Sequence, residues 1–217
     1  MELAGARGYN LAVSTHRSDR EIDEYLPQVL IGGRERPDIR VVDYDPVWAD
    51  RFAAEAAKIH AALGGRELQI DHIGSTAVRG LAAKPIVDIL LVVSDSADED
   101  SYLPALEAAG YVLRVREPGF YEHRMLRTPA RDVHVHVFSP DSPEIERYLT
   151  LRDRLRCDAP DRELYARTKR RLASRRWPTT EHYAEAKTEV IEAIIARATA
   201  PPQQRPSTDP RAGSAAQ

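Results

Sequence analysis

Cysteine and long apolar runs are scarce in this chain of 217 residues, and each scarcity excludes a class of protein. The single cysteine, Cys157, excludes an internal disulfide and is typical of proteins that fold in a reducing compartment. No apolar run approaches the roughly 20 residues that a transmembrane helix needs, and the N-terminal sequence lacks the apolar core of a signal peptide. We therefore expect a soluble, cytoplasmic protein.

An excess of one charge is also lacking, because 34 acidic residues nearly balance 31 basic ones and leave a net charge of −3. Nucleic-acid binding usually depends on a strong basic field, so we expect neither a nucleic acid nor a membrane as partner. A basic stretch at residues 169–176 leaves contact with RNA open as a weaker alternative. A steep loss of affinity with salt would identify such contact.

The length suits one domain with added ends. We divide the chain into an N-terminal extension (1–38), a domain (39–200) and a tail (201–217) whose Pro, Ser, Gln and Gly content predicts disorder. In the extension, Ser18 is expected to cap a short helix that Pro27 ends. Periodicity in the domain predicts an α/β fold with a C-terminal helical cap, in which Asp45, Asp161 and Thr180 are N-caps. The predicted strands are 39–44, 68–73, 86–93, 111–116, 121–127 and 133–138, and the predicted helices of the domain are 46–63, 98–109, 143–157, 161–176 and 180–198.

The most informative stretch is HIGSTAVRGLAAKPIVDILLVV, residues 72–93. Gly74 and Ser75 form a small turn, in which a glycine lets the backbone approach a bound phosphate closely. Asp88 lies inside an apolar run that is typical of a buried strand. A carboxylate there is costly to bury without a cation or hydrogen-bond donor. Together these residues predict a phosphate-cradling turn that faces a metal-capable carboxylate.

A second strand supplies two histidines in the run VHVHV, residues 133–137. His134 and His136 alternate with valines, so both imidazoles point to one side while the valines enter the core. Imidazole can ligate a metal, bind phosphate when protonated, or act as acid or base. The alternative is a solvent-facing strand whose histidines have no function. We predict that both histidines and Asp88 lie in one sheet, with the Gly74–Ser75 turn at the mouth of the same cleft.

The strings HIGSTAVRGLAAKPIVDI and VVDYDPVWADRF resemble the GrpB family, a branch of the nucleotidyltransferase superfamily, and the resemblance extends over about residues 39–198. It implies a mixed sheet with flanking helices and a pocket for a nucleotide or another phosphorylated small molecule. It also implies a divalent metal, Mg²⁺ or Mn²⁺, that assists an in-line displacement. Superfamily members hold the metal with two carboxylates two residues apart, but the second position here is Leu90, as in the GrpB pattern. Asp88 is then the expected metal ligand, and His136 the second ligand or an acid/base.

Cations near this motif are candidates for phosphate binding. Pro85 keeps Lys84 extended beside the turn, and the fork of Arg124 suits bidentate recognition. On the C-terminal helices, the Tyr-x3-Lys pairs that end in Lys169 and Lys187 resemble GrpB positions. For each cation the alternative is a solvated charge or a lysine packed along a tyrosine. The predicted phosphate-binding set is Gly74, Ser75, Lys84, Arg124 and Lys187, and the lower-ranked candidates are His72, Glu122, His123, His134, Lys169 and Tyr183.

Two hypotheses for function follow. The first is an enzyme that transfers a nucleotidyl or related group, with Asp88 and His136 as catalytic residues. The second is a non-catalytic module that binds a nucleotide or a CoA-related ligand, because GrpB-like domains also occur fused to dephospho-CoA kinase. The missing carboxylate at Leu90 favours the second hypothesis.

Overall fold

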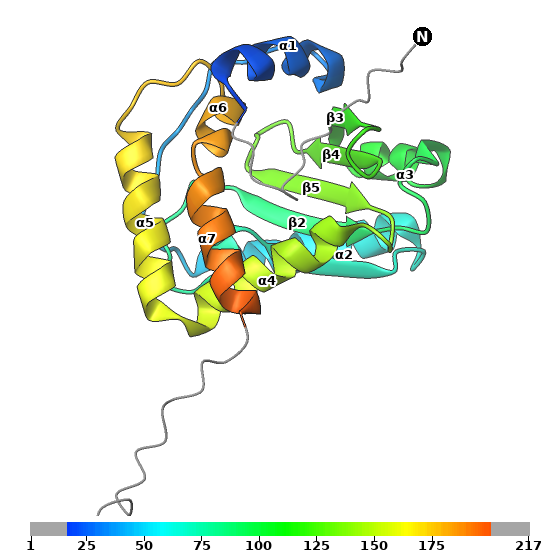
Figure 1. The fold of residues 1–217 in the computed structure, drawn as a ribbon. Coiled ribbons are helices and arrows are strands. Elements are labelled where there is room, and N and C mark those ends of the chain that lie inside the picture. Colours follow the sequence, from blue (N-terminus) through cyan, green and yellow to red (C-terminus); the bar gives the residue numbers. More distant parts are fainter. Residues whose placement is uncertain (1–16, 201–217) are drawn as a thin grey trace, which may run out of the picture.

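A five-stranded mixed sheet with helices on both faces organises the part of the protein that the computed structural model describes, residues 17–200 (Figure 1). The spatial order is β1-β2-β5-β4-β3, in which β2 and β5 are parallel and the other pairs are antiparallel. The α/β fold with a mixed sheet, predicted from the sequence, is confirmed. The strands are β1 (Gln69–Ile73), β2 (Val87–Val92), β3 (Val112–Glu117), β4 (His123–Arg127) and β5 (Val133–Phe138).

The alternation of β5 separates the two faces of the sheet. Val133, Val135 and Val137 are fully buried in the main core, where they pack with residues of α2 (Val47–Leu63) and α3 (Leu103–Ala108). The opposite face carries a smaller apolar cluster that includes Leu90 and packs against α4 (Pro143–Cys157). In Figure 1, α2 lies behind the sheet and α4 in front of it. The predicted entry of the valines into the core is confirmed, and the histidines between them face the other side.

The C-terminal helical cap consists of α5 (Ala159–Ala173), α6 (Thr180–Glu185) and α7 (Thr188–Thr199). The prediction of one helix over residues 180–198 is wrong, because the chain breaks at residues 186 and 187. Two predicted N-caps are also wrong, since Asp158 and Thr179 take these places. Asp161 lies inside the first turn of α5, where its N–H donates to the Asp158 cap and its carboxylate binds Arg154 and Arg197.

The N-terminal extension contributes α1 (Asp19–Val29), which begins at the predicted cap Ser18 with a full capping box. Pro27 lies inside this helix, so the predicted helix end is wrong. A proline leaves the carbonyl four residues earlier without its N–H partner, and here Arg34 donates to that carbonyl of Asp23 at 2.6 Å. The predicted strand 39–44 is reduced to one bridge between Val42 and Ala83.

Short helices η1 (Ser75–Ala77) and η2 (Glu99–Ser101) complete the elements of the described residues. The predicted N-cap Asp45 is wrong, because α2 starts at Val47 and Pro46 takes the N-cap place, although the Asp45 carboxylate accepts from the Val47 N–H at 3.0 Å. Across residues 17–200, no helix combines the length and apolarity that crossing a membrane requires. The predicted disorder of residues 201–217 lies outside the described residues.

Candidate functional site

A cavity of about 1360 Å³ opens on the histidine face of the sheet, between the sheet and helices α1, α4, α5, α6 and α7. Its volume exceeds the roughly 300–1000 Å³ of typical small-molecule sites. Ten of the thirteen residues singled out from the sequence line it, and His72, Glu122 and Arg124 do not. The ten are Gly74, Ser75, Lys84, Asp88, His123, His134, His136, Lys169, Tyr183 and Lys187.

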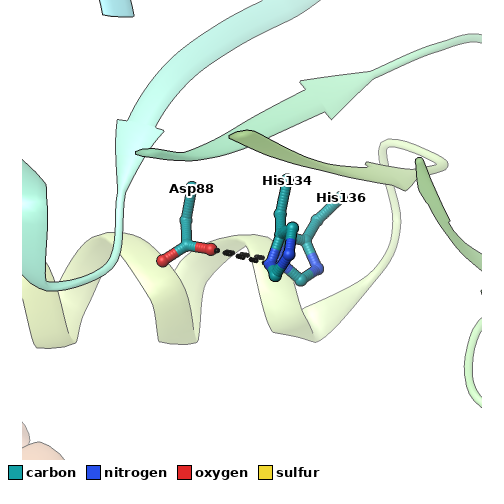
Figure 2. A group of neighbouring side chains, drawn as sticks. All are labelled: Asp88, His134 and His136. Carbon is teal, nitrogen blue, oxygen red and sulfur yellow. Dashed lines mark ion pairs between the residues drawn. The ribbon is translucent and has the colours of Figure 1, made fainter. Parts of the chain in front are cut away.

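Three of these side chains form a metal-capable triad (Figure 2). Asp88 of β2 pairs in register with His134 of β5, and His136 follows on the same face of β5. The Asp88 Oδ1 atom lies 3.5 Å from His134 Nδ1 and 3.8 Å from His136 Nε2. The three ligand atoms all lie within 4.8 Å of one another. These separations exceed a normal N–H···O bond, and ions bound at about 2.0–2.2 Å hold ligands at comparable spacings.

The electrostatics of the triad favour an ionised carboxylate. Burial by itself raises the pKa of Asp88, but His134 and His136 outweigh burial and hold that pKa well below its usual range. The side chains remain accessible, with exposed fractions of 29% for Asp88, 19% for His134 and 18% for His136. A charged carboxylate beside two accessible imidazoles is a donor set that a divalent cation can use.

The Gly74–Ser75 turn lies directly against the triad. Gly74 has φ +67°, and a Cβ built at this position would lie 2.5 Å from Asp88 Oδ2. The glycine therefore serves the close approach of the backbone to Asp88, which the sequence had suggested only for a phosphate. Any side chain at position 74 must displace the carboxylate or the turn.

Lys169 fixes the other side of this turn. Its ammonium group donates to Ser75 Oγ at 2.8 Å and to the Ala82 carbonyl, although its side chain is almost fully buried. Burial, followed by the charges of Lys187 and Arg170, lowers the pKa of Lys169 well below its usual value. The lysine on α5 thus binds the serine of the motif across 94 positions of sequence.

Two further lysines lie close to one tyrosine ring. The Nζ atoms of Lys84 and Lys187 are 5.5 and 4.8 Å from the ring centroid of Tyr183. Burial and the charge of Lys84 lower the pKa of Lys187 to about 8, and burial also lowers the pKa of Lys84. Within residues 17–200 neither side chain forms a hydrogen bond or ion pair. We call Lys84, Lys169 and Lys187 the lysine cluster. The negative charge of Asp88 lies close enough to all three to offset part of the lowering of their pKa values.

A hydrogen-bonded chain behind the triad was missed by sequence reasoning. Glu117 at the end of β3 lies 2.5 Å from His123 Nδ1, and His123 Nε2 lies 3.1 Å from His136 Nδ1. The hydroxyl of Tyr25 on α1 donates to the second oxygen of Glu117 at 2.7 Å. No sequence signal marks Glu117 or Tyr25, because their contacts join α1, β3, β4 and β5.

The three candidates outside the cavity have other partners. Arg124 is buried on the opposite face of β4, where Glu99 at 2.5 Å and Glu122 at 3.2 Å bind its guanidinium, so it is not available for phosphate. His72 contacts the Thr76 hydroxyl at 3.0 Å and stacks on Phe52. Burial lowers the pKa of His72 to about 4, which makes it a neutral side chain that ties the turn to β1.

The fold and the site define an α/β protein with a carboxylate–imidazole triad that faces a lysine cluster across one cavity. Residues 38–197 match the family described as GrpB protein, and the chain belongs to this family, as its motifs predicted. The UPF0157 protein of Halalkalibacterium halodurans is 48% identical over 189 residues, which cover 86% of this chain and 95% of that protein. The UPF0157 protein of Streptomyces coelicolor is 48% identical over 184 residues, with coverages of 85% and 97%. The crystal structure of GrpB from Enterococcus faecalis is similar with a TM-score of 0.64 and 32% identity, over 73% of this chain and 96% of that one.

Proposed function

We propose that the cavity binds a nucleotide or another phosphorylated small molecule together with one divalent metal ion. The observation that carries this proposal is the arrangement of the triad and the lysine cluster around one cavity. Half-buried ammonium groups without anionic partners are costly, and a bound phosphate would compensate them. The Ser75 turn lies between the two groups, since Gly74 touches Asp88 and Ser75 binds Lys169.

The donor set indicates which metal to expect. Two imidazoles and one carboxylate suit Mn²⁺ or Zn²⁺ better than Mg²⁺, which prefers an octahedral shell of oxygens. Of the two ions expected from the sequence, Mn²⁺ is therefore the better match. Three protein ligands leave coordination positions for substrate oxygens or water.

If the bound nucleotide reacts, the expected chemistry is nucleotidyl transfer with a single metal. An acceptor hydroxyl would form a new O–P bond at the α-phosphorus, the bond to pyrophosphate would break, and the hydroxyl proton would leave to water. The lysine cluster would neutralise the departing pyrophosphate. Leu90 is fully buried in an apolar cluster, so the position of the second carboxylate of the superfamily pair offers no metal ligand here.

This same feature favours a second candidate function, a binding or accessory module that holds the ligand without reaction. Product formation distinguishes the transferase from the binding module. We expect nucleotides or CoA-type ligands to raise the melting temperature only with Mn²⁺ or Zn²⁺ present. Release of pyrophosphate, followed by ³¹P NMR over a panel of hydroxyl acceptors, would establish the transferase. Metal-dependent stabilisation without turnover would establish the module, and the absence of any stabilisation would reject both.

A further inference from the structure

Four side chains from four different elements form one hydrogen-bonded chain that ends at the triad. It runs from Tyr25 on α1 to Glu117 on β3, then to His123 on β4 and His136 on β5. Glu117 and His123 are 5% and 6% exposed, so water does not compete for their hydrogen bonds. The His123 and His136 rings lie within 10° of parallel, with centroids 5.3 Å apart. With the two nitrogen atoms only 3.1 Å apart, the hydrogen bond between the rings lies close to their common plane.

The direction of each bond follows from the inventory of donors. An ionised carboxylate only accepts, so His123 Nδ1 carries a proton and donates it to Glu117. A neutral imidazole carries one ring proton, and in His123 this is the Nδ1 proton donated to Glu117, so its Nε2 has a lone pair and accepts from His136 Nδ1–H at 3.1 Å. His136 is then left with an unprotonated Nε2, which lies 3.8 Å from Asp88 Oδ1, too far for a hydrogen bond. This is the tautomer that a metal ion requires of an imidazole ligated through Nε2.

We propose that Glu117 and His123 are positioning residues that fix His136 in its Nδ1–H tautomer and so prepare Nε2 to bind a metal ion. The priming role rests on the metal centre proposed above, whereas the tautomer itself is a property of the metal-free protein. Outer partners of this kind typically change metal affinity by about 10- to 100-fold. Stacking of His123 on Phe138, with centroids 4.7 Å apart, holds the ring in the plane that the bond needs.

The hydrogen-bonded chain of side chains also gives the N-terminal extension a role at the site. Tyr25 lies outside the segment that matches the family, residues 38–197, yet its hydroxyl occupies the second oxygen of Glu117. The connection after α1 is anchored to β3, because Ile31 N–H donates to the Arg114 carbonyl and the Arg114 guanidinium donates to the carbonyls of Ile31 and Gly33. The helix thereby orients the carboxylate that orients the two histidines.

The tautomer can be read without any metal. Long-range ¹H–¹⁵N spectra of the full chain distinguish protonated from unprotonated imidazole nitrogens, and a His136→Gln sample assigns the signals. We expect a protonated Nδ1 and an unprotonated Nε2 for His136 in the wild type. A protonated Nε2 would overturn the proposal. This measurement uses the unaltered protein, so it does not depend on the folding of a variant.

Zn²⁺ titration by calorimetry tests the consequence. Glu117→Gln can offer its amide N–H₂ to His123, which reverses the chain, and we expect Zn²⁺ affinity to fall about 10- to 100-fold. Glu122→Gln is the matched control, because Glu122 lies five positions along the chain and outside the cavity lining, and its affinity should equal the wild type. Equal affinity in Glu117→Gln overturns the positioning role alone. A wild type that binds no Zn²⁺ overturns the metal centre, and the priming role with it.

Discussion

Replacing Gly74 with alanine tests whether the close approach of the turn to Asp88 organises the site. The added Cβ would lie 2.5 Å from Asp88 Oδ2, closer than real Cβ contacts come, and 3.2 Å from its carboxyl carbon. The backbone at Gly74, with φ +67° and ψ −167°, is also one that residues other than glycine rarely adopt. Two separate costs are therefore expected.

The same substitution at a second glycine allows the cost of backbone strain to be measured separately from the cost of the overlap with Asp88. The backbone strain at Gly74→Ala should cost about 1–3 kcal/mol, and the overlap with Asp88 about 1–3 kcal/mol more. Gly80 has φ +79°, and a Cβ added there would meet no atom within 4 Å, so Gly80→Ala carries backbone strain without an overlap. In a protein of this size each kcal/mol lowers the melting temperature by about 2–4 °C.

Urea denaturation of the single variants and of Gly74→Ala combined with Asp88→Ala measures the overlap directly. The double variant should recover part of the loss, with a coupling energy of about 1–3 kcal/mol. Metal affinity should fall in Gly74→Ala and stay unchanged in Gly80→Ala, because only the first displaces a ligand. If the two alanine variants lose equal stability and the coupling is zero, the carboxylate does not depend on the turn.

Three further changes address charge. Asp88→Asn should abolish the rise in melting temperature with Mn²⁺ or Zn²⁺ and lower the metal-free value, because the His134 imidazole favours the ionised form; an unchanged metal response contradicts the metal centre. Lys187→Gln should weaken binding of a nucleoside triphosphate at least tenfold without lowering the ligand-free melting temperature, since burial disfavours its charge. Lys58→Gln is the control, because Lys58 lies outside the cavity lining, and it should leave this binding unchanged. Glu144 is fully buried, and burial raises its pKa to about 7 from 4.5, so its contribution to stability is present at low pH and lost as the pH rises from 4.5 through 7. Glu144→Gln should remove this loss in denaturation curves measured between pH 4.5 and 8, and a parallel pH dependence in both proteins would refute the assignment.

The parts of the site that could be predicted are those that local patterns specify. Alternation in VHVHV places both imidazoles on one face and the valines in the core, and an aspartate inside an apolar strand requires a partner. These two inferences were sufficient to bring Asp88, His134 and His136 together. The Gly-Ser turn was also placed correctly, although its glycine makes room for Asp88 rather than only for a ligand.

The parts that could not be predicted depend on pairing between distant strands. Arg124 and His123 are adjacent in sequence and lie on opposite faces of β4, so choosing the functional one requires knowing which face meets β5's histidines. The role of Glu117 depends on the β3–β4 register that sets it opposite His123. Pro27 lies inside a helix, where Arg34, seven positions further on, donates to the carbonyl that the proline leaves without its N–H partner.

The parallel pairing of β2 and β5 has a consequence for how the protein folds. The two strands are neighbours in the sheet, yet residues 93–132, which include α3, β3 and β4, separate them along the chain. Closing so long a loop is entropically unfavourable and must precede the meeting of Asp88 with the histidines. A metal ion that needs all three ligands therefore has no complete site in the early folding chain. It would slow unfolding of the native protein while leaving the rate of refolding nearly unchanged.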